Sequence, residues 1–133
     1  MTVDRSTPAT GSAGASTELA LDRPIDLRVL LGPLARGSGD PTMRVAASAA
    51  IRASMTPDGP GTIDIRVVAG ATGAGGATVR AQAWGPGAAS LLAGLPALLG
   101  LDDDDTGFDP GLHPRVAALA HRLGRVRLGR TGA

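Results

Sequence analysis

The sequence of 133 residues lacks cysteine, lysine and tyrosine, and it contains one tryptophan and one phenylalanine. The absence of cysteine excludes disulfide bonds, thiolate metal sites and a cysteine nucleophile. Because a Walker-type loop needs a lysine to contact the phosphates of a nucleotide, that loop is excluded as well. Two aromatic side chains do not make the stacking platform on which single-stranded nucleic acids bind.

Long apolar runs are also missing. The longest, Leu91–Leu101, contains Pro96 and falls far short of the roughly 20 residues that a membrane span needs. Residues 1–16 are rich in small and polar residues and lack the continuous apolar stretch of a signal peptide. We therefore expect no contact with membranes and a cytoplasmic location.

Small apolar residues and arginine dominate what is present. Hydrophobic residues make up 43% of the chain, but many of them are alanine, which buries little area at about 25 cal/mol per Å². We therefore expect marginal stability for the isolated chain, as a monomer or an aggregation-prone species. All 13 basic residues are arginine and the net charge is +1, so charge alone would not coat DNA with this protein.

Residues 1–22 are predicted to be a disordered tail because of their polar, low-complexity composition. Beyond them, apolar and polar residues alternate as in half-buried strands. This pattern occurs in four stretches, which are Ile25–Leu31, Thr42–Met55, Ile63–Val67 and Val79–Trp84. The second stretch accommodates two strands or one strand with a bulge. Turn residues at 57–61 and glycines at 70–76 separate the later strands, which favours hairpins.

The hydrophobic period then changes to three and four residues, the spacing of a helix face. Residues 88–99 predict one helix, which Pro96 is expected to kink or split. Pro114–Leu123 predicts a second helix with an apolar stripe of Val116, Leu119, Ala120 and Leu123. Strands followed by helices predict an α+β fold, a small antiparallel sheet of four to five strands with two helices packed on one face.

Few residue patterns suggest chemistry. Asp102–Asp105 resembles the start of a calcium-binding EF-hand loop, but position twelve would be His113 where a bidentate glutamate is required. A solvated acidic loop is the better interpretation. His113 and His121 lack the spacing of a metal site, and they fit the start and the end of the second helix. Asp109 is close enough in sequence for a hydrogen bond to His113.

The C-terminal region combines arginine with glycine. Arg125, Arg127 and Arg130 alternate with small or apolar residues, and such a segment can contact DNA phosphates. It can equally be a solvated linker. These three arginines are the candidate DNA-binding residues, and we identify no catalytic residue, metal site or cofactor site.

Four segments in order resemble the N-terminal domain of AlkA-type DNA-3-methyladenine glycosylases of actinobacterial type. They are Asp26–Val45, Ala53–Val67, Ala83–Gly111 with its WGPGA, LPALLG and DDDD motifs, and His113–Gly132 with RLGRTG. The resemblance implies a small antiparallel sheet with helices, similar in outline to half of a TATA-binding-protein fold. Members of that family flip an alkylated base out of DNA and hydrolyse its N-glycosyl bond without a metal or organic cofactor.

In that family, a helix-hairpin-helix unit binds the DNA backbone and an aspartate just after it stabilises the sugar cation, and both lie in a downstream helical domain. No hairpin motif followed by an aspartate is present in this sequence. The resemblance thus implies a tail at 1–22, an α+β domain at 23–112, and a helix and arginine/glycine linker at 113–133 leading towards a catalytic domain. We expect this chain to be the non-catalytic N-terminal part of a base-excision DNA repair protein, inactive alone. The alternative is a stand-alone nucleic-acid-binding module without enzymatic activity.

Overall fold

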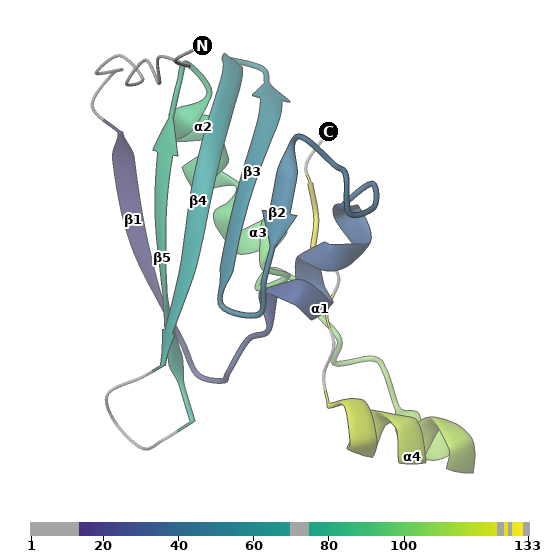
Figure 1. The fold of residues 1–133 in the computed structure, drawn as a ribbon. Coiled ribbons are helices and arrows are strands. Elements are labelled where there is room, and N and C mark those ends of the chain that lie inside the picture. Colours follow the sequence, from purple (N-terminus) through teal and green to yellow (C-terminus); the bar gives the residue numbers. More distant parts are fainter. Residues whose placement is uncertain (1–13, 70–74, 125–126, 128, 132–133) are drawn as a thin grey trace.

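A computed structural model describes residues 14–69, 75–124, 127 and 129–131 of the chain (Figure 1). The strands are β1 (Ala15–Leu21), β2 (Met43–Val45), β3 (Ala49–Thr56), β4 (Gly59–Ala69) and β5 (Ala77–Trp84). The helices are α1 (Leu27–Leu31), α2 (Ala88–Ala93), α3 (Leu95–Leu98) and α4 (Pro114–Leu123), with short 3-10 turns η1 (Gly32–Leu34) and η2 (Pro110–Leu112). The predicted α+β class with an antiparallel sheet is confirmed.

The five strands form one open sheet in the order β1-β5-β4-β3-β2, and all neighbours are antiparallel. The stretch from Thr42 to Met55 forms two strands rather than one with a bulge. The predicted turn after β3 is present at Pro57 and Asp58. β4 and β5 form the predicted antiparallel pair, although residues 70–74 of their connection lie outside the described residues.

The prediction of a disordered tail is wrong for residues 15–21, which form β1 at the edge of the sheet beside β5. Leu19 and Leu21 pack against the core, and Glu18 accepts a hydrogen bond of 2.8 Å from Arg80 Nε on β5. The alternation of Thr17, Leu19 and Leu21 is the signal that the small and polar neighbours concealed. Residues 1–13 lie outside the described residues.

The predicted strand at Ile25–Leu31 is also wrong, because Leu27–Leu31 is the helix α1. Asp26 caps it, and its Oδ1 accepts hydrogen bonds from the backbone N–H groups of Arg28 (2.8 Å) and Val29 (3.3 Å). Leu27, Leu30 and Leu31 are buried at helical spacing. An aspartate directly before the helix is a recognised start signal, and it overrides a short alternating pattern that fits both structures.

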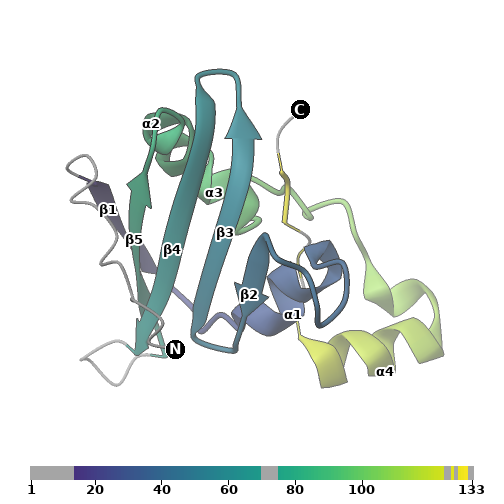
Figure 2. The same ribbon diagram turned by 45° about the horizontal axis from the view of Figure 1, so that its top comes forward.

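Helices cover one face of the sheet, as predicted, but one of the two is not the helix we expected (Figures 1 and 2). The 88–99 helix is split at Gly94 into α2 and α3, and Pro96 lies in the first turn of α3, where a missing N–H costs least. α1 provides the second covering helix. α4 forms with its predicted bounds but packs against η2 and stands apart from the sheet in both views.

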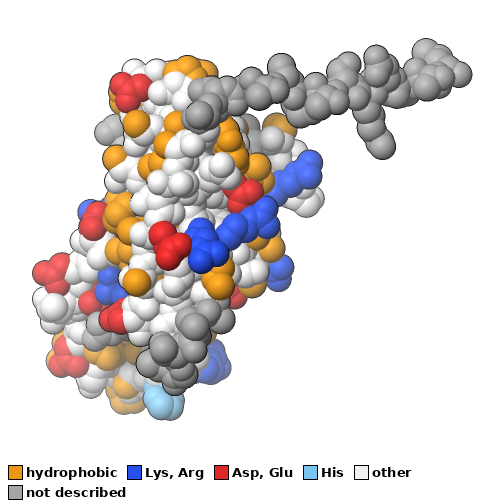
Figure 3. All heavy atoms as spheres, turned by 90° about the vertical axis from the view of Figure 1, so that its left-hand side faces the viewer, with side chains coloured by type: hydrophobic (Ala, Val, Ile, Leu, Met, Phe, Trp, Pro, Cys, Tyr) orange, Lys and Arg blue, Asp and Glu red, His pale blue; other side chains and the backbone are white. Residues whose placement is uncertain are grey.

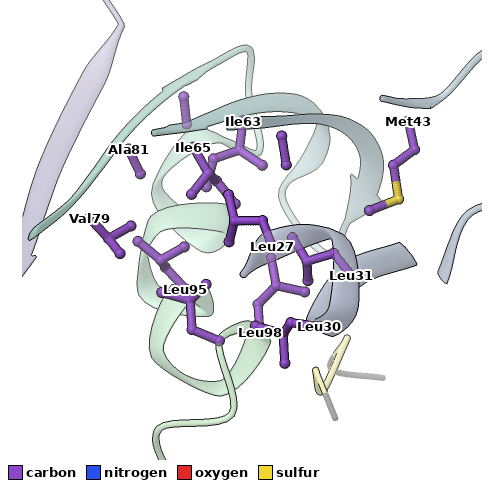
Figure 4. Close-up of a cluster of buried hydrophobic side chains, with 13 residues drawn as sticks. Leu27, Leu30, Leu31, Met43, Ile63, Ile65, Val79, Ala81, Leu95 and Leu98 are labelled. Atoms are coloured by element: carbon purple, nitrogen blue, oxygen red, sulfur yellow. The ribbon is translucent and has the colours of Figure 1, made fainter. Parts of the chain in front are cut away.

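The core lies between the sheet and the helices α1, α2 and α3. Side chains of Leu27, Ile65 and Leu95 gather there, and each is completely buried (Figure 4). The inward faces of β4 and β5 supply the other wall, with Ile63 and Val79 fully or almost fully buried. The helices α1, α2 and α3 thus occupy one face of the sheet, and no helix among the described residues covers the opposite face (Figures 1 and 2).

Candidate functional site

The arm formed by η2 and α4 is built by local capping. Asp109 Oδ1 accepts a hydrogen bond of 2.8 Å from Gly111 N, and His113 Nδ1 accepts one of 3.2 Å from Arg115 N. Each side chain thus bonds a backbone amide of its own turn, and no hydrogen bond joins Asp109 to His113 among the described residues. His121 lies in the last helical turn, where positive charge is favourable, as the sequence predicted.

The apolar stripe of α4 is uncovered. Val116 is 37% exposed, Leu119 45% and Leu123 59%, and no residue of α4 is buried. Leu112 in η2 and Phe108 before it are more exposed still, at 84% and 63%. Large exposed apolar patches mark interaction sites in folded proteins. The arm therefore presents an apolar surface that the rest of the described chain does not cover.

The end of α4 meets the sheet domain at a small hollow. A cavity of about 210 Å³ is lined by Ile25, Val29, Leu99, Leu123 and Arg127, among others. These residues come from the segment that enters α1, from α1 itself, from the end of α3 and from the arm. A helix packed along α4 would therefore also contact the sheet domain at this hollow.

The base of the arm is closed by Arg127. Its Nη1 donates hydrogen bonds to the backbone oxygens of Gly100 (2.7 Å) and Asp103 (3.1 Å). Its Nη2 lies 3.7 Å from Asp105 Oδ1, and the arginine side chain is 16% exposed. Gly100 and Arg127 are 27 positions apart in the sequence, so the contacts of this one guanidinium hold the two ends of the arm together.

Arg130 makes a second connection to the acidic loop. Its Nε lies 2.7 Å from Asp103 Oδ1, and its backbone N–H donates to Ala97 O at 3.1 Å. Gly129 lies so close to α3 that an added Cβ would come within 2.6 Å of Leu98 O. Arg127 and Gly129 are therefore half-buried against the domain, whereas Arg130 and Thr131 are exposed, so a fully solvated linker does not describe this segment.

Two members of the acidic run Asp102–Asp105, Asp103 and Asp105, pair with these arginines. Asp104 caps the loop instead: its Oδ1 accepts hydrogen bonds from Thr106 Oγ1 (2.7 Å) and Thr106 N (3.0 Å). These bonds, the hydroxyl bond first, lower the pKa of Asp104 below its usual value. In the part of the chain that the structure describes, no three acidic or histidine side chains are arranged to hold a metal ion.

The three candidate DNA-binding arginines thus have different outcomes. The structure brings Arg127 and Arg130 together on one loop, with Arg127 largely enclosed and Arg130 66% exposed at its side chain. Arg125 lies outside the described residues. Of the two placed arginines, Arg130 is the one that a ligand can reach.

The open face of the sheet carries a charged band that the sequence reasoning did not single out. Arg66 on β4 is directly opposite Arg80 on β5. Each has an acid partner: Arg66 donates to both carboxylate oxygens of Asp64 at 2.6 and 2.8 Å, and Arg80 bonds Glu18. Figure 3 shows acidic and basic side chains side by side on this part of the surface. Alternation along each strand is enough to predict that Arg66 and Arg80 point away from the core. Their position opposite each other follows only from the strand register.

One end of the same face is apolar. Trp84, Met55, Ala53 and Thr62 border a shallow hollow of about 550 Å³ together with residues of the adjoining turns. Met55 is 77% exposed. The open face therefore combines paired arginines at its middle with an apolar rim at one end.

Comparisons with known proteins find no match to this chain among protein-family models, curated proteins or solved structures. Function is therefore inferred from the surfaces described above. Among the described residues, no helix has the length and apolar character needed to cross a membrane.

Proposed function

We propose that this chain is a non-catalytic α+β domain of a DNA-3-methyladenine glycosylase-like repair protein. In this role the domain supports a helical catalytic domain that removes alkylated bases from DNA. The resemblance of four consecutive segments, quoted above, motivates the proposal. An antiparallel sheet with helices on one face agrees with the fold that the resemblance implies.

The observation that carries the proposal is the exposed apolar stripe of α4. Val116, Leu119 and Leu123 recur at helical spacing on a helix that packs on neither face of the sheet. Burying a large aliphatic side chain stabilises a complex by about 1.5–3 kcal/mol, so three such residues favour a packed partner. A helical domain fits best, because an apolar stripe on a helix packs into the grooves between the side chains of another helix.

The base of the arm supports the same assignment. Arg127 ties both ends of the arm to one loop, so α4 can be presented to a partner without unfolding the sheet domain. The cavity of about 210 Å³ beside Leu123 and Val29 continues the apolar surface onto the domain. A helical partner would therefore contact both α4 and the segment around α1.

A base-release assay tests the proposed function. Methylated duplex DNA is incubated with this chain, with the separately produced helical domain of an actinobacterial 3-methyladenine glycosylase, and with both together. We expect background release of 3-methyladenine from the chain alone and more release from the mixture than from the helical domain alone. Leu119→Asp should remove the stimulation, whereas Ala118→Asp on the opposite side of α4 should keep it.

Two outcomes would contradict the proposal. One is base release by the chain alone that is lost on substituting Asp109 or an aspartate of the 102–105 run. The other is a mixture no more active than the helical domain, with no association between the two proteins by analytical ultracentrifugation.

A stand-alone nucleic-acid-binding module is the second candidate, and the arginines of the open face favour it. Arg44 lies on the same face as Arg66 and Arg80 and has no ion-pair partner among the described residues. Phosphate contacts of this kind weaken as salt rises. Duplex binding by the chain alone that falls with salt and is lost in Arg44→Gln would favour this candidate. This second candidate does not require the chain to stimulate base release by the helical domain.

A further inference from the structure

A cavity on the helix side of the sheet has an unusual lining. It measures about 460 Å³, which is within the range of about 300–1,000 Å³ of small-ligand sites. Strand β3, helices α2 and α3, and the C-terminal segment enclose it. Its polar lining residues are Arg52, Ser54, Thr56, Ser90, Arg130 and Thr131. Its lining shares Ser54 and Met55 with the shallow hollow at the apolar end of the open face.

The inward face of β3 breaks the pattern of its neighbours. Register places Arg52 directly opposite Met43 on β2 and Ile63 on β4, and both of those side chains are buried. Along β3, the same face continues with Ser54 and Thr56 instead of apolar residues. Polar residues at positions that point towards a core are errors of patterning unless they serve a function.

Arg52 is also without a counter-charge. Its guanidinium has no hydrogen-bond or ion-pair partner among the described residues, and the residue is half-buried. Removing an arginine from water without a partner costs free energy. An anion in the cavity would supply that partner.

Arg130 brings a second guanidinium to the same cavity. The hydrogen bond from its backbone N–H to Ala97 O fixes its position beside α3. Its Nε faces Asp103, which leaves the two terminal nitrogens available. Asp103 is the counter-charge of Arg130, whereas Arg52 has none among the described residues.

The hydroxyl groups of the lining divide into two sets. Thr56 Oγ1 donates to Gly59 O at 2.8 Å, and Ser90 Oγ donates to Asp58 Oδ2. Ser54 and Thr131 have no side-chain hydrogen bond among the described residues. Two hydroxyl groups without a partner, together with the unpaired guanidinium of Arg52, suit a tetrahedral oxyanion.

We propose that this cavity binds one phosphodiester group of a nucleic-acid backbone between Arg52 and Arg130, with Ser54 and Thr131 as hydroxyl donors. A phosphodiester carries one negative charge, whereas a phosphate monoester at neutral pH carries about 1.5 to 2. Backbone phosphates are the groups that arginine and hydroxyl side chains contact in order to position a protein on DNA. The inference rests on the proposed function for the source of the phosphodiester, namely DNA.

Fluorescence anisotropy with an undamaged, labelled DNA duplex tests the site on the full chain. Each phosphate contact contributes about −0.9 to the slope of log K against log salt. Arg52→Gln and Arg130→Gln should each reduce the magnitude of that slope by about 0.9. Arg52→Lys should keep it, and Arg28→Gln on the exposed side of α1 should leave binding unchanged. Equal losses in Arg28→Gln and Arg52→Gln, or no loss in the cavity variants, would overturn the site.

NMR titrations with small ligands separate the possible sources of the anion. Dimethyl phosphate should shift the backbone amides of Ser54 and Thr131 and compete with the duplex. Inorganic phosphate that binds more tightly than dimethyl phosphate would overturn the phosphodiester assignment. If the chain stimulates the helical domain but the cavity variants bind DNA normally, the site is wrong and the proposed function stands. If the cavity variants lose DNA binding but no association with the helical domain occurs, the proposed function is wrong and the site stands.

Discussion

The sheet layer and the arm use the same kind of amphipathic pattern with opposite results. In β4, Ile63 and Ile65 are 1% and 0% exposed, because α1, α2 and α3 cover them. In α4, Leu119 and Leu123 recur just as regularly and remain 45% and 59% exposed. An apolar stripe therefore predicts which face of an element will be buried, and the tertiary structure decides whether this chain buries it.

The difference divides the molecule into a part that completes its own core and a part that presents apolar surface. The two parts meet at the acidic loop, where Asp103 and Asp105 pair with Arg130 and Arg127. Disturbing the sheet layer should therefore unfold the domain, and disturbing the arm should leave the domain folded.

The largest effect is expected in the sheet layer. Ile65→Ala removes a completely buried side chain and should lower the free energy of unfolding by about 2–5 kcal/mol. Urea denaturation followed by circular dichroism measures the change. Val29→Ala, at a half-exposed position of α1, is the control and should change it by less than about 0.5 kcal/mol. Equal effects of the two variants would show that the core has been placed wrongly.

A smaller effect is expected where the C-terminal segment joins the domain. Gly129→Ala places a Cβ within 2.6 Å of Leu98 O, so the segment must shift, at a cost of about 1–3 kcal/mol. Hydrogen exchange at the Arg130 amide should accelerate. Gly107→Ala meets no atom within 4 Å and should leave that exchange unchanged. An unaltered Arg130 amide in Gly129→Ala would contradict the packing of this segment.

Much of this architecture is predictable because strand and helix periods are local properties. The β4 and β5 alternation, the α2–α3 split near Pro96 and the bounds of α4 follow from sequence. α1 does not, since five residues are too few to separate alternation from a helical face, and the cap by Asp26 decides the outcome.

The candidate sites depend on contacts between distant segments, which the sequence pattern does not contain. In the sequence, Arg52 is an ordinary polar residue of a strand, and only the register shows that it lies between Met43 and Ile63. Arg127 and Arg130 read as a linker until the chain returns to α3 and the acidic loop. The opposite charges of the acidic run and of these two arginines could have suggested that they pair, but the sequence does not contain the geometry of the pairing.

In the arm, substitution should change association and hardly change stability. Leu119→Asp replaces a side chain that is 45% exposed, so the free energy of unfolding should change by less than about 0.5 kcal/mol. Thermal unfolding by circular dichroism measures this. A loss comparable to that of Ile65→Ala would show that α4 belongs to the core of the isolated chain.

The smallest effect concerns Asp40 in the loop before β2. Hydrogen bonds from Arg36 N, and then from Thr42 Oγ1 and N, lower the pKa of Asp40 from 3.8 to about 2. Because the folded state lowers this pKa, its contribution is complete above pH 3.8 and is lost as the pH falls towards about 2. Asp40→Asn should flatten the acid limb of stability against pH. An unchanged limb would contradict the role of these bonds.

Amide hydrogen exchange along the whole chain, with and without the helical glycosylase domain, tests whether the sheet layer completes its own core while α4 is covered only by a partner. In the isolated chain, we expect the amides of β4 and β5 to exchange far more slowly than those of α4, because only the strands lie over a covered core. Adding the helical domain should slow exchange in α4 and leave the strands unchanged. The account would be contradicted if α4 were as protected as β4 in the isolated chain, or if saturating helical domain left α4 exchange unaltered.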